Sequence, residues 1–204
     1  HVLQDSVRGM GDNGVNFNTL ISDTTGAEFN QSDADGLSSL DSDGFTVGYN
    51  DSQAWNLNAD TYVGWNWKAG TSFSNDASAT GVGSIDSSGS VNTDAGFSII
   101  KADSVPASTT STIAHGLGVK PDVVLLKSRN NATNWEMYHS SLTPDAERKL
   151  YLNTTSAEID SGFMNDTPPT STVFSFNPGA SDSNHIAYCF AEVDGYSKFG
   201  GYSG

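Results

Sequence analysis

The same short motif occurs twice in the chain. Residues 20–28 read LISDTTGAE and residues 150–158 read LYLNTTSAE, so both follow the order Leu-x-x-(Asp/Asn)-Thr-Thr-(Gly/Ser)-Ala-Glu. An internal repeat constrains the fold strongly, because each copy is expected to form the same supersecondary unit. The segments that follow the motif also correspond, as a short strand-like segment and then an aromatic one: 45–49 (FTVGY) and 62–68 (YVGWNWK), then 173–177 (VFSFN) and 185–192 (HIAYCFAE).

The two copies differ in what precedes the motif. Only 19 residues come before the first copy, whereas the second is preceded by further strand-like segments such as residues 96–101 (GFSIIK) and 122–129 (DVVLLKSR). The sequence between the units is rich in Gly, Ser and Asp, and it is either a linker or a source of edge strands. We therefore expect three parts: the C-terminal part of a first β unit (residues 1–70), the linker or edge-strand segment (71–95), and a nearly complete second unit (96–204).

Composition and periodicity indicate an all-β fold. Charged residues make up only 16% of the chain and there are 21 glycines, which is typical of short strands joined by many turns. Residues 122–129 hold an apolar run that is too short for a helix, and residues 62–68 alternate with period two. Residues 143–150 (TPDAERKL) form the one expected helical turn. The predicted fold is an antiparallel, jelly-roll-like β-sandwich of two related units with minimal helix.

The charge balance excludes several classes of partner. The chain carries 24 acidic and 9 basic residues, for a net charge of -15, and its first hundred residues contain only two bases, Arg8 and Lys68. Nucleic-acid affinity depends on clustered Lys and Arg, so we expect no nucleic-acid partner. No apolar run approaches the roughly 20 residues that span a bilayer, so membrane insertion is not expected either.

No assembled catalytic set is recognisable in the sequence. Cys189 lies in a predicted buried strand and is expected to be an inert core thiol. Glu28 and Glu158 occupy equivalent places in the two motif copies, which favours a shared structural role over an acid–base pair. The four histidines lack metal-ligand spacing, and no nucleophile elbow or phosphate loop is present. We expect a non-enzymatic protein without a cofactor.

A cluster of acidic residues is a candidate cation site. Asp33, Asp35, Asp41 and Asp43 lie in SDADGLSSLDSDG, which lacks the EF-hand spacing; turn formation is the favoured interpretation, and calcium binding is a weaker hypothesis.

Aromatic residues are expected to divide between core and surface. On alternating strands the core is the expected place for Trp65, Trp67 and Phe190. Aromatics in polar or Gly-rich segments are instead candidates for stacking on a ligand or packing against another subunit. Those candidates are Trp55, Tyr196, Phe199 and Tyr202.

The second unit contains the segments IAHGLGVKPDVVLLKSR, NWEMYHSSL, KLYLNTTSAE and IAYCFAEVDGYSKFGGYSG, and the first contains DSVRG, DGLSSLDSDGFTVG and DTYVGWNWKAG. With these segments the chain resembles a repeat module of large proteins from marine bacteriophages and related uncultured viruses. Such proteins are similar to tail fibres and other virion-surface proteins. The resemblance carries over no catalytic residues.

The resemblance implies a virion structural module, on the extracellular surface of the particle, that presents contacts to a host receptor, either glycan or protein. A homo-oligomer, by fibre analogy a trimer, and other virion proteins are the expected partners. Two alternatives stay open: a capsid decoration or filament-forming protein, and a glycan-degrading depolymerase.

Overall fold

The computed structural model describes residues 1–11, 14–30, 36–48, 56–142, 148–179 and 183–202. These residues form an antiparallel, sandwich-like all-β structure with one short helix, which confirms the predicted fold class. The elements are β1 (Val2–Leu3), β2 (Leu20–Ile21), β3 (Leu37–Leu40), β4 (Phe45–Val47), β5 (Thr71–Asn75), α1 (Ala77–Thr80), β6 (Ser87–Asn92), β7 (Phe97–Ala102), β8 (Ser111–Ala114), β9 (Val123–Ser128), β10 (Glu136–His139), β11 (Arg148–Tyr151), β12 (Ile159–Asp160), β13 (Val173–Phe176) and β14 (His185–Phe190).

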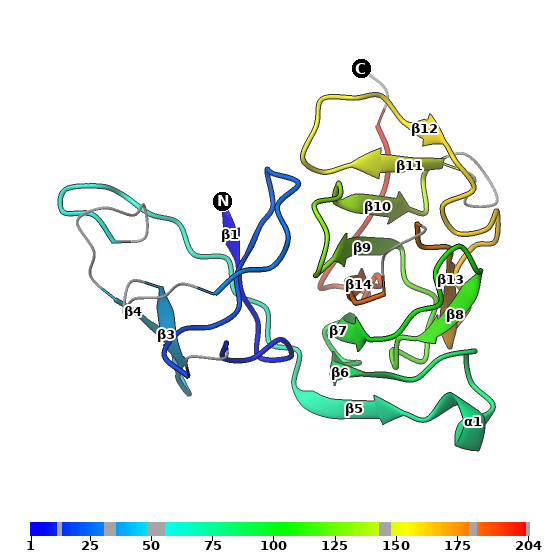
Figure 1. Cartoon of the computed structure of the whole chain (residues 1–204), viewed down its shortest axis with the longest axis horizontal. Coiled ribbons are helices and arrows are strands. Elements are labelled where there is room, and N and C mark those ends of the chain that lie inside the picture. Colours follow the sequence, from blue (N-terminus) through cyan, green and yellow to red (C-terminus); the bar gives the residue numbers. More distant parts are fainter. Residues whose placement is uncertain (12–13, 31–35, 49–55, 143–147, 180–182, 203–204) are drawn as a thin grey trace.

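An eight-stranded sheet, in the order β12-β11-β10-β9-β14-β7-β6-β5, organises the molecule (Figure 1). Every neighbouring pair in it is antiparallel. One side is the meander β5-β6-β7 and the other is the meander β9-β10-β11-β12, with β14 hydrogen-bonded between β7 and β9. Between the meanders the chain leaves the sheet to form β8, and it leaves again to form β13 before it returns as β14.

The central strand β14 is buried on both faces. Ile186, Tyr188 and Phe190 point to one face, and Ala187 and Cys189 point to the other, because successive side chains alternate across a strand. A strand covered on both faces is expected to read as a nearly continuous apolar run. The sequence HIAYCF in β14 and VVLL in β9 fit this rule, and both segments form the strands that the sequence predicted.

One face of the sheet is covered by the two-stranded sheet β8–β13 (Figure 1). Ile113 and Phe174 from this pair are almost fully buried against Ile100, Val124 and Cys189 of the large sheet. Met164, from the loop between β12 and β13, closes the same cluster. This packing of sheet on sheet forms the larger of the two apolar cores.

The opposite face is covered by the N-terminal arm, defined as residues 1–11 and 14–29. Leu20 of the arm has no exposed surface and packs in one cluster with Trp135, Ile186 and Tyr188 of the sheet. The indole N–H of Trp135 donates to the carbonyl oxygen of Ile21 at 2.9 Å. The arm and the β8–β13 pair therefore lie on opposite sides of the large sheet (Figure 1).

The two copies of the repeated motif have the same local backbone. In each copy the N–H of the first threonine donates to the carbonyl three residues earlier, and its hydroxyl accepts from the N–H two residues later. The strands that precede the two copies pair in the same register. The β-bridge between Thr19 and Phe29 in the first copy corresponds to the pair Lys149↔Ile159 in the second. The corresponding strand pairs are Val2↔Ile21 and Leu3↔Leu20 in the first copy, and Glu136↔Tyr151 and Met137↔Leu150 in the second.

Residues 71–95 contribute two strands to the large sheet. They supply β5 and β6, which add to β7, and the single-turn helix α1, capped by Asp76 and Gly81. Within the described ranges, no helix is long and apolar enough to span a membrane.

Two local predictions are wrong. Residues 62–68 were expected as a strand but form none, because no described strand pairs with them. The sequence predicts a helical turn over residues 143–150, but residues 148–150 belong to strand β11, where Arg148 and Lys149 pair with β12. Residues 143–147 lie outside the described residues.

Candidate functional site

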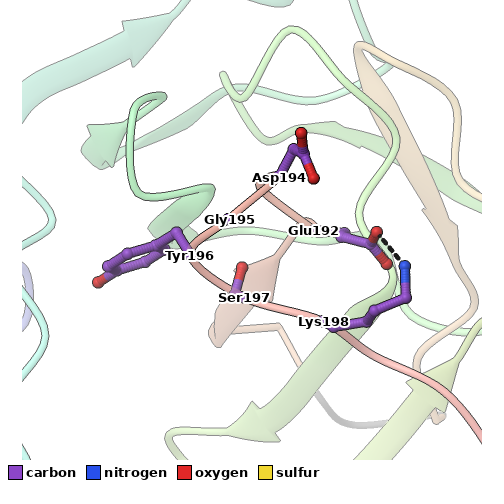
Figure 2. Close-up of a pocket in the computed structure, with 6 residues that line it drawn as sticks. All are labelled: Glu192, Asp194, Gly195, Tyr196, Ser197 and Lys198. Carbon is purple, nitrogen blue, oxygen red and sulfur yellow. Dashed lines mark hydrogen bonds and ion pairs between the residues drawn. The ribbon is translucent and has the colours of Figure 1, made fainter.

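The C-terminal turn, residues 192–198, carries Tyr196, one of the predicted contact aromatics. Tyr196 is 70% exposed, and its N–H donates to the carbonyl of Val193 at 3.0 Å. Lys198 Nζ binds Glu192 Oε1 at 2.6 Å, and Figure 2 shows Tyr196 pointing away from this pair. The turn encloses a shallow hollow of about 310 Å³. The exposed ring of Tyr196 is therefore placed to contact a ligand or a neighbouring subunit.

The other predicted contact aromatics differ in their surroundings. Tyr202 is 97% exposed. Phe199 is half-buried, and its ring centroid lies 6.2 Å from that of Phe190, so this side chain extends the apolar cluster of the sheet. Trp55 lies outside the described residues.

The predicted acidic cluster is described only in part. Asp33 and Asp35 lie outside the described residues. Asp41 and Asp43 are exposed in the turn between β3 and β4, where the N–H of Asp41 donates to the carbonyl of Gly44 and its Oδ2 accepts from the hydroxyl of Thr46. Among the described residues no group of three or more His, Cys, Asp or Glu could hold a metal ion.

The aromatic segment, residues 62–67, is exposed rather than buried. Trp65 and Val63 are each 78% exposed and Trp67 is 56% exposed, so the prediction that both tryptophans lie in the core is wrong. The sequence of this segment alternates with period two, but burial also requires a sheet for the apolar side chains to pack against. Trp67 lies at the margin of the core, with its ring 6.3 Å from Phe97 and 6.1 Å from Phe190.

A second exposed side chain adjoins the aromatic segment. The ring of Phe45 in β4 is 42% exposed and lies beside Gly64. We call Phe45 together with residues 62–65 the aromatic patch. Exposed apolar patches of this kind mark contact surfaces in soluble proteins.

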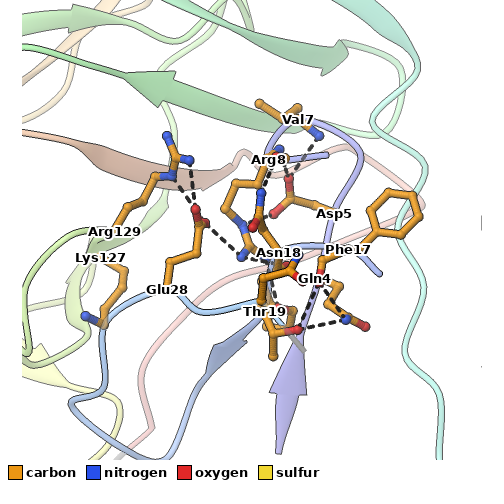
Figure 3. A network of polar contacts seen from close by, with 12 residues as sticks. Gln4, Asp5, Val7, Arg8, Phe17, Asn18, Thr19, Glu28, Lys127 and Arg129 are labelled. Atoms are coloured by element: carbon orange, nitrogen blue, oxygen red, sulfur yellow. Dashed lines mark hydrogen bonds and ion pairs between the residues drawn. The ribbon is translucent and has the colours of Figure 1, made fainter. Parts of the chain in front are cut away.

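A buried ionic network joins the N-terminal arm to the sheet (Figure 3). The side chain of Arg8 has no exposed surface, and its Nε donates to Asp5 Oδ2 at 2.6 Å. The hydroxyl of Tyr188 in β14 donates to the same oxygen at 2.6 Å. Burial, followed by the charge of Asp5, holds the pKa of Tyr188 well above its ordinary value. The phenol is therefore a neutral donor that fixes the arm to the central strand.

Glu28 extends this network to β9. Its carboxylate accepts from Arg8 Nη1 at 3.2 Å and from Arg129 Nη2 at 2.8 Å. Arg129 also binds Asp103 at 3.1 Å, and its carbonyl accepts the N–H of Glu28. In the second motif copy, Glu158 likewise binds an arginine, Arg148, at 3.3 Å. Both motif glutamates thus bind guanidinium groups.

A polar cleft opens between the two layers of the sandwich. It has a volume of about 550 Å³ and lies where β9, β10 and β11 face the end of β13. Leu126 and Phe176 line its apolar part, and Pro178 follows Phe176 on the same wall. Its polar lining comes from the segment between β9 and β10, from strand positions and from the residue that follows β13: Ser128, Asn131, Thr133, Asn134, Glu136, Lys149, Asn177 and His185.

An ion pair lies inside the polar cleft. Lys149 Nζ binds Glu136 Oε1, and the side chains are 11% and 24% exposed respectively. The ammonium group also lies 5.2 Å and 5.4 Å from the ring centroids of Tyr151 and Phe163, within the range of cation–π contacts. The cation is therefore fixed by one acid and two rings.

The sequence did not single out any residue of this cleft as a site. Glu136 and Lys149 lie on neighbouring strands and become adjacent only through the pairing of β10 with β11. No short-range spacing reports such a pair, so only the sheet register could have revealed it.

The comparisons with known proteins identify the family. The model described as a domain of unknown function, DUF7483, matches residues 1–204. The chain belongs to the DUF7483 family. No curated protein and no solved structure matches the chain.

Proposed function

We propose that this DUF7483 domain is a non-enzymatic structural module of a phage virion, part of a tail fibre or similar surface appendage, that presents contacts to a host receptor. The observation that carries the proposal is the display of large aromatic side chains outside a rigid sheet. Trp65, Tyr196 and Tyr202 are 78%, 70% and 97% exposed. Recognition residues typically lie on loops held by a rigid scaffold.

The resemblance of the sequence motifs to a repeat module of marine phage proteins supports the virion context. The burial of the central strands on both faces supports a rigid framework, because the arm and the β8–β13 pair pack on opposite faces of the sheet. A net charge of -15 keeps such a surface soluble and disfavours nucleic-acid partners.

The depolymerase alternative finds no specific support in the cleft. Hydrolysis of a glycosidic bond commonly uses two carboxylates, about 5–9.5 Å apart. Among the described residues that line the polar cleft, Glu136 is the one carboxylate, and it is bound to Lys149.

The capsid-decoration or filament alternative draws on the aromatic patch. Val63 and Trp65 could equally be covered by a neighbouring subunit, since exposed apolar residues are enriched in such contacts. Location on the particle distinguishes the two structural roles.

The test is immunogold electron microscopy of purified phage particles that carry the encoding gene. Label on tail fibres or appendages is the expected result. Label over the capsid shell would favour the decoration role, and particles without label would overturn the proposal. Sedimentation of the purified protein tests the expected trimer, which a monomer at micromolar concentration contradicts.

Attachment is tested by competition between the purified protein and the particles for host cells. We expect Trp65→Ser to weaken competition by the protein, because it removes the most exposed ring of the aromatic patch. Val119→Ser is the matched control, since Val119 is 50% exposed in the segment between β8 and β9 and is not part of that patch. Equal loss in both variants would contradict a specific role for Trp65.

A further inference from the structure

We propose that the polar cleft binds a neutral sugar residue of a glycan, with the Glu136–Lys149 pair at the centre of recognition. The inference rests on the proposed function, because it assigns a ligand class and a place on the module to the receptor contact. The volume of about 550 Å³ lies within the usual range of small-molecule sites.

The cleft has lining that complements both kinds of surface on a pyranose ring. Sugar rings have an apolar face of C–H groups and a rim of hydroxyls. Phe176 and Pro178 supply apolar lining, and Thr133, Asn134 and Asn177 supply hydroxyl and amide groups. The side chains of Thr133 and Asn177 make no hydrogen bond within the part of the chain that the structure describes, so both are available to a ligand.

The ion pair adds a donor and an acceptor at fixed positions. Lys149 Nζ uses one of its three protons on Glu136 Oε1, and Glu136 Oε2 has no partner among the described residues. A sugar hydroxyl both donates and accepts, so one hydroxyl can accept from Lys149 while its neighbour donates to Glu136. Hydrogen bonds to charged groups are the stronger ones.

The charge of the cleft favours a neutral ligand. The cation of Lys149 is compensated by Glu136, and a chain with a net charge of -15 repels anions. A phosphate or sulfate would therefore find the Lys149 ammonium group already paired with Glu136. A purely apolar ligand would leave the polar lining without hydrogen bonds, which is costly.

The site is preorganised by the sheet. Glu136 pairs with Leu126 of β9 and with Tyr151 of β11, so its backbone is fixed on both sides. The rings of Tyr151 and Phe163 hold the Lys149 ammonium group. Little conformational entropy is then lost by these two side chains when a ligand binds.

The experiment is saturation-transfer NMR followed by calorimetry on the full chain. The probes are galactose, mannose, glucose, N-acetylglucosamine, lactose and maltose at millimolar concentration. We expect transfer to at least one of these sugars, with an affinity that falls about tenfold or more in Glu136→Gln. Thr133→Trp, which puts a large side chain into the lining of the cleft at a position outside the ion pair, should abolish binding.

Lys198→Met is the matched control, because it breaks an ion pair of the same type with Glu192 outside the cleft. It should bind as the wild type does. Circular dichroism of each variant verifies the fold, and Thr133→Trp keeps the test informative should Glu136→Gln unfold.

The outcomes separate the two proposals. Sugar binding that survives both cleft variants, or no binding to any probe, overturns the cleft assignment, while label on the tail appendages leaves the virion role intact. Sugar binding lost in the cleft variants together with unlabelled particles supports the cleft and overturns the virion role.

Discussion

At the residue scale, His115 holds the turn after β8 as a neutral imidazole. Its Nδ1 accepts the N–H of Leu117 at 3.3 Å, so the proton lies on Nε2, which faces the carbonyl oxygen of Thr170 at 3.2 Å. Burial lowers the pKa of His115 from 6.5 to about 4, against a smaller opposing effect of the hydrogen bond to Thr170. Protonation would replace the Nδ1 acceptor with a donor and break this arrangement.

This residue predicts a loss of stability in acid. Because the pKa of His115 is lower in the folded state, the unfolded chain binds the proton first, and the free energy of unfolding falls as the pH drops from 6.5 to about 4. The loss from this residue is on the order of 2–3 kcal/mol. Urea denaturation at several pH values measures it. His115→Gln should flatten the dependence across that window, and an unchanged slope in this variant would contradict the assignment.

The thiol of Cys189 is expected to be protected from thiol-reactive reagents in the native protein. The thiol is fully buried in β14, and burial raises its pKa to about 12, so almost no thiolate forms at neutral pH. A thiol-reactive disulfide reagent should therefore react with the native protein only at the rate of unfolding and react at once in denaturant. Fast labelling of the native chain would show that β14 is accessible.

At the element scale, the sequence predicted correctly the strands that lie at the centre of the large sheet, with a hydrogen-bonded strand on each side. Residues 122–129 and 185–192 form β9 and β14, where both faces are buried. The pattern in residues 62–68 is equally clear, yet Val63 and Trp65 stay exposed because a strand also needs a neighbouring edge. Alternation reports which side chains share a face, and it does not report whether a sheet exists to receive them.

The site was less predictable than the strands. Tyr196 and Tyr202 were found because aromatic residues in a Gly-rich tail have few places to be buried, and both are exposed. The polar cleft was missed because Glu136, Lys149 and Phe176 come from three strands that only the topology brings together. A sequence motif cannot encode a pair set by sheet register.

The close approach of β6 to β7 makes Gly89 a position where substitution should destabilise the fold. A Cβ atom on Gly89 would lie 1.9 Å from the backbone carbonyl oxygen of Ile99, so this strand pair has no room for a side chain at that position. Gly89→Ala should lower the free energy of unfolding by about 1–3 kcal/mol or more. Gly44→Ala is the control, because no atom lies within 4 Å of its Cβ position, and it should stay within about 0.5 kcal/mol. Chemical denaturation compares the two, and equal stabilities would contradict the close approach.

At the scale of the whole molecule, the N-terminal arm and the large sheet share one core. Leu20 of the arm is buried in the cluster that contains Trp135, Ile186 and Tyr188, and the arm has little core of its own. We therefore expect the arm and the sheet to unfold together, with fluorescence and circular dichroism giving coincident transitions.

The ionic network makes this coupling testable through Arg8→Met. The variant keeps a side chain of similar length but leaves Asp5, which is 4% exposed, without its cation while Tyr188 still points at it. Removing one partner of a buried ion pair typically costs about 3–5 kcal/mol, because the remaining charge stays desolvated. We expect a loss of this size in chemical denaturation and faster proteolysis within the arm. Lys198→Met, at an exposed pair, should leave stability unchanged. A wild-type-like Arg8→Met would show that apolar contacts alone hold the arm on the sheet, and separate transitions in the wild type would show that the two parts fold independently.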